Sequence, residues 1–161
     1  MILLTIGTQL PFDRLVKAMD DIAATLPEDI FGQIGHASYT PVHMQWAATL
    51  RPDEFDKKFR DASVIVSHAG IGTILAAQKH RKPLVLMPRL ASHGEHRNDH
   101  QLATAQQVRD KPGVYVAEDP DELAALLRRG DLEAARDDLE LTGRTLFVNN
   151  IRSYLASGMT Q

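Results

Sequence analysis

The sequence predicts an α/β protein with a Rossmann-like parallel sheet and helices on both faces. Apolar runs rich in β-branched residues occupy 2–6, 64–66 and 84–87, and segments with helical spacing of apolar residues lie between them. Apolar strands that alternate with helices are typical of a parallel sheet buried on both sides. Because ligands of such sheets bind at the carboxyl ends of the strands, the turns after these runs are the places to look for function.

The first part of the chain follows the order strand, glycine turn and helix. The run 2–6 predicts a strand, and the segment 11–22 carries apolar residues at helical spacing after a proline. Two weaker strands are expected at 30–34 and 43–47, divided by a connection with glycine, serine and proline. A charged amphipathic helix with proline near its start is expected over 52–62.

The second part contains the clearest unit of the fold. A strand at 64–66 runs through a glycine turn into a helix over about 74–79 and on to the strand 84–87, followed by a polar loop at 88–97. The remaining expected elements are helices over 98–108, about 121–127 and 131–155, and a short strand over 114–116. The length and order of these elements fit a single domain over residues 1–161.

The composition excludes several classes of protein. Of the 161 residues, 43% are apolar and 24% charged, which is typical of a soluble globular domain. The net charge of -3 argues against a nucleic-acid-binding protein, because phosphate contacts need a basic surface. The sequence has no cysteine, no apolar stretch long enough to span a membrane and no basic leader with a cleavage site, so we expect a cytoplasmic protein.

Two short segments, after the first and fourth predicted strands, carry residues that suit a ligand that contains phosphate. They are Gly7 and Thr8 after the first strand, and His68, Gly70, Gly72 and Thr73 after the fourth. The first pair allows close approach to the backbone, although a tight turn explains it equally well. The second group precedes a helix whose free N–H groups and dipole favour an anion. A plain strand-to-helix turn is the alternative, since the segment is neither a Walker loop nor a complete GxGxxG fingerprint.

Charged and hydrogen-bonding residues crowd the loop after the strand 84–87 and the start of the next helix. The candidate binding residues there are Arg89, Glu95, His96, Arg97, Asn98, Asp99 and Gln101. Such a loop suits sugar hydroxyls and phosphates, with a solvated loop as the alternative. His93, His96 and His100 would suggest a metal site if they shared a helical face, but Gly94 interrupts that helix, so no metal is expected.

Together these segments resemble the C-terminal, donor-binding domain of glycosyltransferase family 28, and the likeness covers nearly the whole chain. It rests on TIGTQLPFD at 5–13, VIVSHAGIGTIL at 64–75, KPLVLMPR at 82–89 and GEHRNDHQLA at 94–103. Within the family, the sequence closely resembles the PssE-like subunits of bacterial exopolysaccharide synthesis. A more distant likeness is to the small catalytic subunit of the eukaryotic transferase that adds the second GlcNAc to dolichol diphosphate.

The resemblance implies a fold equivalent to the C-terminal half of a GT-B glycosyltransferase. It also implies the donor-binding catalytic subunit of a two-component inverting enzyme, which moves a sugar such as glucuronic acid or galactose from a UDP-sugar to a polyprenyl-diphosphate-linked saccharide in exopolysaccharide or capsule synthesis. A membrane-anchored, acceptor-binding subunit would be the partner and would recruit the chain to the inner face of the cell membrane. The alternative is a non-catalytic, regulatory module that binds nucleotide sugars.

Residue roles follow from the resemblance by position. His68 and the backbone of 70–73 are expected at the donor diphosphate, and residues 7–8 face them across the cleft. Asp99 and Gln101 match the positions that hold the transferred sugar. The general base that activates the acceptor is not identified and is expected on the partner.

One departure from the family pattern concerns the ribose. Many relatives carry an acidic residue where this chain has Ala76, so either Glu95 or another residue binds the ribose hydroxyls, or the ribose is held less tightly. Helix N–H groups, with His68 if it is protonated, would stabilise the departing diphosphate without a metal or other cofactor. Arg89 and Arg97 would pair with a carboxylate on the sugar, which suits glucuronic acid.

The last expected helix, about 131–156, carries an apolar stripe. Its members are Phe147, Ile151, Tyr154 and Leu155. Such a stripe either packs into the core or docks the missing half of the enzyme, and an isolated half-enzyme could also pair with itself as a homodimer.

Overall fold

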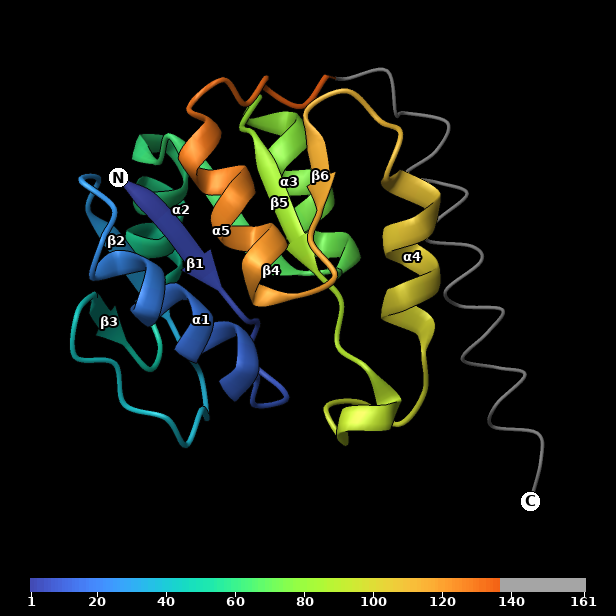
Figure 1. Cartoon of the computed structure of the whole chain (residues 1–161). Helices are drawn as coiled ribbons and strands as arrows, with labels where there is room; N and C mark the ends of the chain where they lie inside the picture. Colours follow the sequence, from blue (N-terminus) through green and yellow to red (C-terminus); the bar gives the residue numbers. More distant parts are fainter. Residues whose placement is uncertain (137–161) are drawn as a thin grey trace.

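The computed structural model describes residues 1–136, in which strands and helices alternate along the chain (Figure 1). The strands are β1 (Ile2–Thr5), β2 (Ile30–Gln33), β3 (Gln45–Ala47), β4 (Val64–His68), β5 (Leu84–Met87) and β6 (Val114–Val116). The helices are α1 (Asp13–Ala23), α2 (Pro52–Asp61), α3 (Ile71–Lys79), α4 (His100–Val108) and α5 (Pro120–Arg129), with a 3-10 turn at Ala91–His93.

The described strands form one parallel sheet in the order β3-β2-β1-β4-β5-β6. From β1 the chain moves outward to β2 and β3, and it then returns to place β4 on the other side of β1, where Thr5 pairs with Ser67. The chain therefore reverses its direction of travel between β1 and β4. A crevice opens at such a switch point, beyond the carboxyl ends of the strands.

Two apolar cores, one on each face, confirm that the sheet is covered on both sides. Leu4 of β1 packs with α1 and α5 in one core, and the adjacent Leu3 packs with α2, α3 and α4 in the other. Figure 1 shows α1 and α5 in front of the sheet, with α2 and α3 behind it. Burial of each large aliphatic side chain contributes about 1.5–3 kcal/mol, so these cores hold the strands in place.

Local signals fix the ends of α5. Asp119 accepts a hydrogen bond from Glu122 N at 2.8 Å, Pro120 occupies the first turn, and Gly130 ends the helix with a left-handed φ of 69°. None of the helices found in residues 1–136 has the length and apolar character needed to span a lipid bilayer.

Several expected boundaries are corrected by the structure. Helix α3 begins at Ile71 rather than near 74, α4 begins at His100 rather than 98, and β3 is confined to Gln45–Ala47. Residues 131–136 are not helical. The rest of the helix expected over 131–156, with its apolar stripe, lies outside the described residues.

The segment after α5 crosses tightly over the loop that precedes β6. Ala135 is 1% exposed, and its N–H donates to the Lys82 carbonyl at 3.3 Å. Gly113, with φ of 77°, lies beneath it, and a Cβ there would come within 2.2 Å of the Ala135 nitrogen. Only glycine fits at this crossing.

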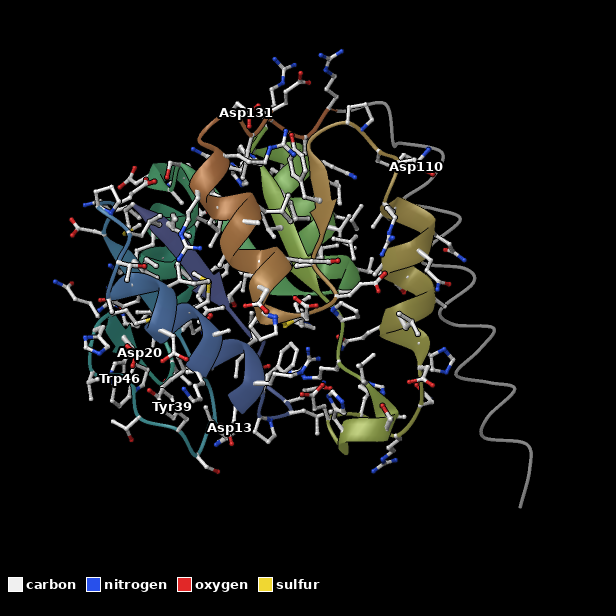
Figure 2. The ribbon with its side chains drawn as sticks, in the orientation of Figure 1. Asp13, Asp20, Tyr39, Trp46, Asp110 and Asp131 are labelled. Carbon is white, nitrogen blue, oxygen red and sulfur yellow. The ribbon has the colours of Figure 1, made fainter. Side chains whose placement is uncertain are left out.

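The connection between β2 and β3 is held to α1 by two aspartates (Figure 2). Asp13 Oδ1 accepts hydrogen bonds from two consecutive backbone N–H groups, those of Ser38 and Tyr39. Asp20 is fully buried and accepts from the Tyr39 hydroxyl at 2.8 Å. It also accepts from the backbone N–H groups of Val42, His43 and Met44. These bonds replace the regular structure that this connection lacks.

Candidate functional site

A pocket of about 480 Å³ lies at the switch point of the sheet. Its walls are Gln9 and Leu10 after β1, Ala69 and Gly70 after β4, and His96, Arg97, Asn98, His100, Gln101 and Thr104 from the loop after β5 and from α4. Five residues expected from the sequence, Gly70, His96, Arg97, Asn98 and Gln101, therefore line one pocket. The other expected residues, Gly7, Thr8, His68, Gly72, Thr73, Arg89, Glu95 and Asp99, are not among the residues that line it.

The imidazole of His68 lies between the backbones of two glycines. A Cβ at Gly70 would come within 2.4 Å of His68 Nε2, and a Cβ at Gly7 would come within 3.0 Å of Cε1. Gly7 also has a left-handed φ of 75°. The two glycines thus make room for this side chain, which joins the turns after β1 and β4 into one wall beside the pocket.

His68 is neutral at physiological pH. Burial lowers the pKa of His68 to about 4, and the nearby charge of Arg89 acts in the same direction. Protonation of the ring, the condition under which His68 would bring a charge to the diphosphate, is therefore disfavoured in the structure. Nδ1 lies 3.3 Å from the Ser67 hydroxyl oxygen, and when that hydroxyl donates to Nδ1, Nε2 carries the ring proton and is a hydrogen-bond donor.

The N-terminus of α3 adds further donors. Gly70 is the residue that caps this helix, so Gly72 and Thr73 lie in its first turn, where the N–H groups have no partners within the helix. The first turn contains no acidic residue to offset the dipole. A Cβ at Gly72 would meet nothing within 4 Å, so space is open there. This helix end is suited to an anion next to the pocket.

The loop between β5 and α4 is folded on itself by its own side chains. Asp99 Oδ1 accepts from Ala91 N at 3.0 Å, and Gln101 Oε1 accepts from Arg89 N at 3.1 Å. These are the two residues that the resemblance places at the transferred sugar. Each uses one oxygen to shape the loop, and only Gln101 lines the pocket.

Arg89 differs from its expected role at a sugar carboxylate. Its side chain is 3% exposed, and Nη2 donates to the carbonyls of Ile6 at 2.8 Å and Leu10 at 2.7 Å. Burial lowers the pKa of Arg89 to about 10, so the group still carries its charge near neutral pH. Arg89 therefore fixes the loop after β1, and Arg97, which is exposed at the pocket, is the arginine placed to meet a ligand.

The side chain of Glu95 is also engaged in contacts within the protein. Its carboxylate forms a two-pronged ion pair with Arg14, with Nε to Oε1 at 2.8 Å and Nη2 to Oε2 at 2.9 Å, and it accepts from Leu90 N. Burial favours the neutral acid, but the hydrogen bonds of Arg14 outweigh it and lower the pKa of Glu95. Both oxygens of Glu95, one of the candidates for the ribose hydroxyls, are therefore engaged within the protein. Ala76 has no group that could bind a hydroxyl, and it packs against the core on the α3 side of the sheet.

Arg14 is the residue that sequence reasoning missed. It lies on α1, 81 positions before Glu95, and no local pattern connects the two. Besides Glu95, its guanidinium donates to the Pro88 carbonyl at 2.9 Å. Only the folded topology, which places α1 beside the loop after β5, brings this pair together.

The three histidines weighed as metal ligands do not converge. In the part of the chain that the structure describes, no three His, Cys, Asp or Glu side chains are placed to hold one ion. His93 lies 4.0 Å from Glu95, while His96 and His100 line the pocket.

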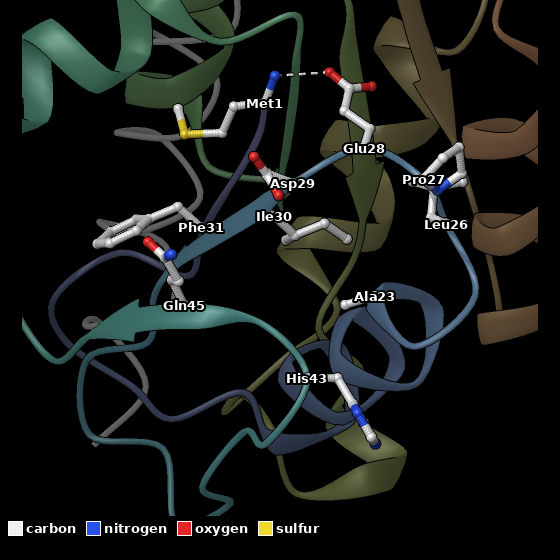
Figure 3. A pocket seen from close by; sticks show the side chains of 10 residues that line it. All are labelled: Met1, Ala23, Leu26, Pro27, Glu28, Asp29, Ile30, Phe31, His43 and Gln45. Atoms are coloured by element: carbon white, nitrogen blue, oxygen red, sulfur yellow. Dashed lines mark hydrogen bonds and ion pairs between the residues drawn. The ribbon is translucent and has the colours of Figure 1, made fainter.

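A smaller hollow of about 280 Å³ lies at the opposite, amino-terminal edge of the sheet (Figure 3). It is bordered by Met1, whose amino group pairs with Glu28 at 2.8 Å, and by the starts of β2 and β3. No glycine turn or helix N-terminus opens there. Parallel sheets bind ligands at the other edge, so this hollow is not the candidate site.

The fold and the site define the chain as a Rossmann-like α/β domain equivalent to the C-terminal half of GT-B glycosyltransferases. Residues 1–145 match the glycosyltransferase family 28 C-terminal domain, and the chain belongs to that family. No curated protein sequence matches it.

Solved glycosyltransferases share the fold at low sequence identity. CalG4, the calicheamicin glycosyltransferase, is 16% identical with a TM-score of 0.60, over 98% of this chain and 44% of CalG4. SsfS6 of Streptomyces sp. SF2575, complexed with thymidine diphosphate, is 22% identical with a TM-score of 0.57, over 90% of this chain and 35% of its own. MurG of Acinetobacter baumannii is 20% identical with a TM-score of 0.52, over 79% and 40%. The chain thus spans less than half the length of each.

Proposed function

We propose that this chain is the donor-binding half of a two-component inverting glycosyltransferase. It takes a sugar from a UDP-sugar and passes it to a polyprenyl-diphosphate-linked saccharide in exopolysaccharide or capsule synthesis. The observation that carries the proposal is the pocket at the switch point, where the His68 turn, the open end of α3 and Arg97 meet. In a family 28 domain, this arrangement suits a nucleotide diphosphate joined to a sugar.

Fixed donors stabilise the leaving group in this proposal. As the sugar leaves, negative charge grows on the nucleotide diphosphate, and the first-turn N–H groups of α3 are already oriented to meet it. In the tautomer that carries the ring proton on Nε2, neutral His68 adds a further donor beside them. These groups need no rearrangement during the reaction, so we propose that the transfer proceeds without a metal.

The walls on the other side of the pocket suit the sugar. His96, Arg97, Asn98 and Gln101 present cationic and amide groups there, which bind hydroxyls or a carboxylate. Arg97 alone carries the proposal of an acidic sugar such as glucuronic acid, because Arg89 is bound to backbone carbonyls. The titration below compares binding of the glucose and glucuronic acid donors.

The matched enzymes are more than twice as long as the region that they share with this chain, which supports an acceptor-binding half in addition to these 161 residues. We propose that it is a separate, membrane-anchored subunit that supplies the general base. This subunit would recruit the chain to the inner face of the cell membrane, and without it the chain could form a homodimer.

Calorimetric titration with UDP, UDP-glucose, UDP-glucuronate, GDP and thymidine diphosphate tests the donor site. We expect selective binding of uridine nucleotides that is lost in His68→Ala. Selective binding of thymidine diphosphate would replace UDP in the proposal. Binding of no nucleotide by the folded chain, alone and with the acceptor-binding subunit, would contradict the donor site itself.

A non-catalytic module that senses nucleotide sugars is the second candidate. The observation that favours it is the ion pair of Glu95 with Arg14, which engages the acidic residue considered for the ribose hydroxyls in place of the one missing at Ala76. Both candidates bind the donor. Only the enzyme releases UDP from a UDP-sugar when the acceptor-binding subunit and a lipid-linked acceptor are added, so this assay separates them.

A further inference from the structure

Two arginine side chains connect the loops after β1 and β5, which form two sides of the pocket, and they do so in opposite directions. Arg14, from α1 after β1, reaches the loop after β5, and Arg89, from the loop after β5, reaches back to the loop after β1. The ring centre of Phe12 lies 5.3 Å from the Arg14 guanidinium and 5.0 Å from that of Arg89. These three side chains connect the two sides of the pocket.

Arg14 acts on the loop through Glu95. The Glu95 side chain is 12% exposed, and its two oxygens hold Arg14 Nε, Arg14 Nη2 and Leu90 N. A partly buried, two-pronged ion pair of this kind fixes both partners in one geometry. The next residue, His96, is the first of the pocket wall formed by this loop, so the position of Glu95 sets where that wall begins.

Arg89 holds the facing wall. It donates to the carbonyl of Leu10, and Leu10 lines the pocket together with Gln9. The two walls therefore keep their separation through contacts between residues 6 and 95 of this chain. When a binding site already has its bound shape in the free protein, little binding free energy is spent on ordering its loops and side chains.

We propose that Arg14 is a positioning residue that holds the loop 88–99 through Glu95, and that the donor pocket is consequently formed by this chain alone. The inference rests on the proposed function, which it extends by assigning donor capture to this chain and leaving only acceptor binding and proton removal to the partner. Arg14 has no contact with the ligand in this scheme. Its effect on binding comes from the fraction of molecules whose loop is in place.

The test uses the full 161-residue chain and UDP as the probe. Arg14→Ala and Glu95→Gln should raise the Kd for UDP about tenfold, which corresponds to a correctly placed loop in about a tenth of the molecules. Arg14→Lys should have a smaller effect, because lysine keeps the charge but cannot bind both carboxylate oxygens in a fork. The matched control is Arg60→Ala, which breaks an exposed ion pair with Asp56 on α2 and should leave the Kd unchanged.

Amide exchange without ligand separates positioning from general destabilisation. In Arg14→Ala the Leu90 N–H should exchange faster, while the amides of the central strands β1 and β4 stay protected. The inference is overturned if the wild-type chain alone does not bind UDP, or if Arg14→Ala lowers Tm but leaves the Kd within about twofold of wild type. Binding of UDP that depends on Arg14, without sugar transfer in the complete assay, would contradict the proposed function and leave this inference standing.

Discussion

His68 Nε2 faces the backbone of Gly70 so closely that a Cβ at Gly70 would come within 2.4 Å of it. The backbone of Gly70, with φ of -93° and ψ of 133°, is open to any residue, so the cost of Gly70→Ala is steric. We expect this variant to displace the imidazole, to lose about 1–3 kcal/mol of stability and to bind UDP more weakly. Urea denaturation and calorimetry measure the two effects.

Gly72→Ala is the matched comparison. A Cβ at Gly72 meets nothing within 4 Å, and alanine is favoured over glycine inside a helix. Its stability should therefore rise by up to about 1 kcal/mol. Equal losses of stability in the two variants would show that the His68 contact is not what requires Gly70.

Asp20→Asn should destabilise the protein by about 2–4 kcal/mol, because one side-chain oxygen is replaced by an NH₂ group that cannot accept hydrogen bonds. The carboxylate accepts from three backbone N–H groups and from the Tyr39 hydroxyl. Asp21→Asn, which changes an exposed carboxylate beside it, is the control and should have little effect. Thermal unfolding of both variants provides the comparison, and equal Tm values would refute the anchoring role of Asp20.

Acid should weaken the Asp20 anchor. Burial alone would raise the pKa of Asp20, but the hydrogen bonds from the backbone and Tyr39 lower it below 3.8. A carboxyl with a depressed folded pKa stabilises the fold above its unfolded pKa, and this contribution is lost as pH falls through the folded value. The excess stability of wild type over Asp20→Asn should thus be constant above about pH 5 and shrink in stronger acid. Urea denaturation at several pH values measures this difference.

His68 should make stability depend on pH in a milder range. Its folded pKa, about 4, is below the ordinary value of 6.5, so between these values the unfolded chain binds a proton that the folded chain excludes. Titration of His68 should therefore lower the free energy of unfolding by about 2 kcal/mol from pH 8 to pH 5, and His68→Gln should remove this part of the pH dependence. A His68 ring signal that titrates near 6.5 in an NMR experiment would contradict this assignment.

Substitution of Arg97 should change donor preference, whereas substitution of Arg89 should change stability. Arg97→Ala is expected to lower the preference for UDP-glucuronate over UDP-glucose with little change in Tm, since its side chain is exposed at the pocket. Arg89→Lys is expected to lower Tm, because a lysine cannot replace the two carbonyl contacts of the buried guanidinium. If Arg97→Ala leaves the preference unchanged, an acidic sugar is not recognised by this residue.

The fold class could be predicted because its signals are local. The apolar runs at 2–6, 64–66 and 84–87 correspond to β1, β4 and β5, and the glycine turn after β4 lies at the switch point. The sequence predicts too late a start for α3 because Gly70 and Gly72 suggest a longer turn, whereas the apolar Ile71 and Ile74 already pack in the core behind the sheet. Packing thus outweighed glycine's low helix propensity.

The location of the candidate site could be predicted better than the roles of its individual residues. The sequence indicates that Arg89 and Glu95 are polar residues in a loop near the ligand, and both do lie beside the pocket. It does not indicate that their partners are the Leu10 carbonyl and Arg14, since each contact joins segments about 80 positions apart. Likewise, the low pKa of His68 depends on burial and on Arg89, which only the assembled fold brings close.

The crossing of Ala135 over Gly113 bears on how this protein can be engineered. A reporter or a second domain joined directly after Gly130 would pull the following residues away from the Lys82 carbonyl and uncover the side of β6 that they close. A junction placed beyond Arg136 keeps that closure. In fusions and shortened versions of this protein, any cut therefore has to lie after the crossing and not at the end of α5.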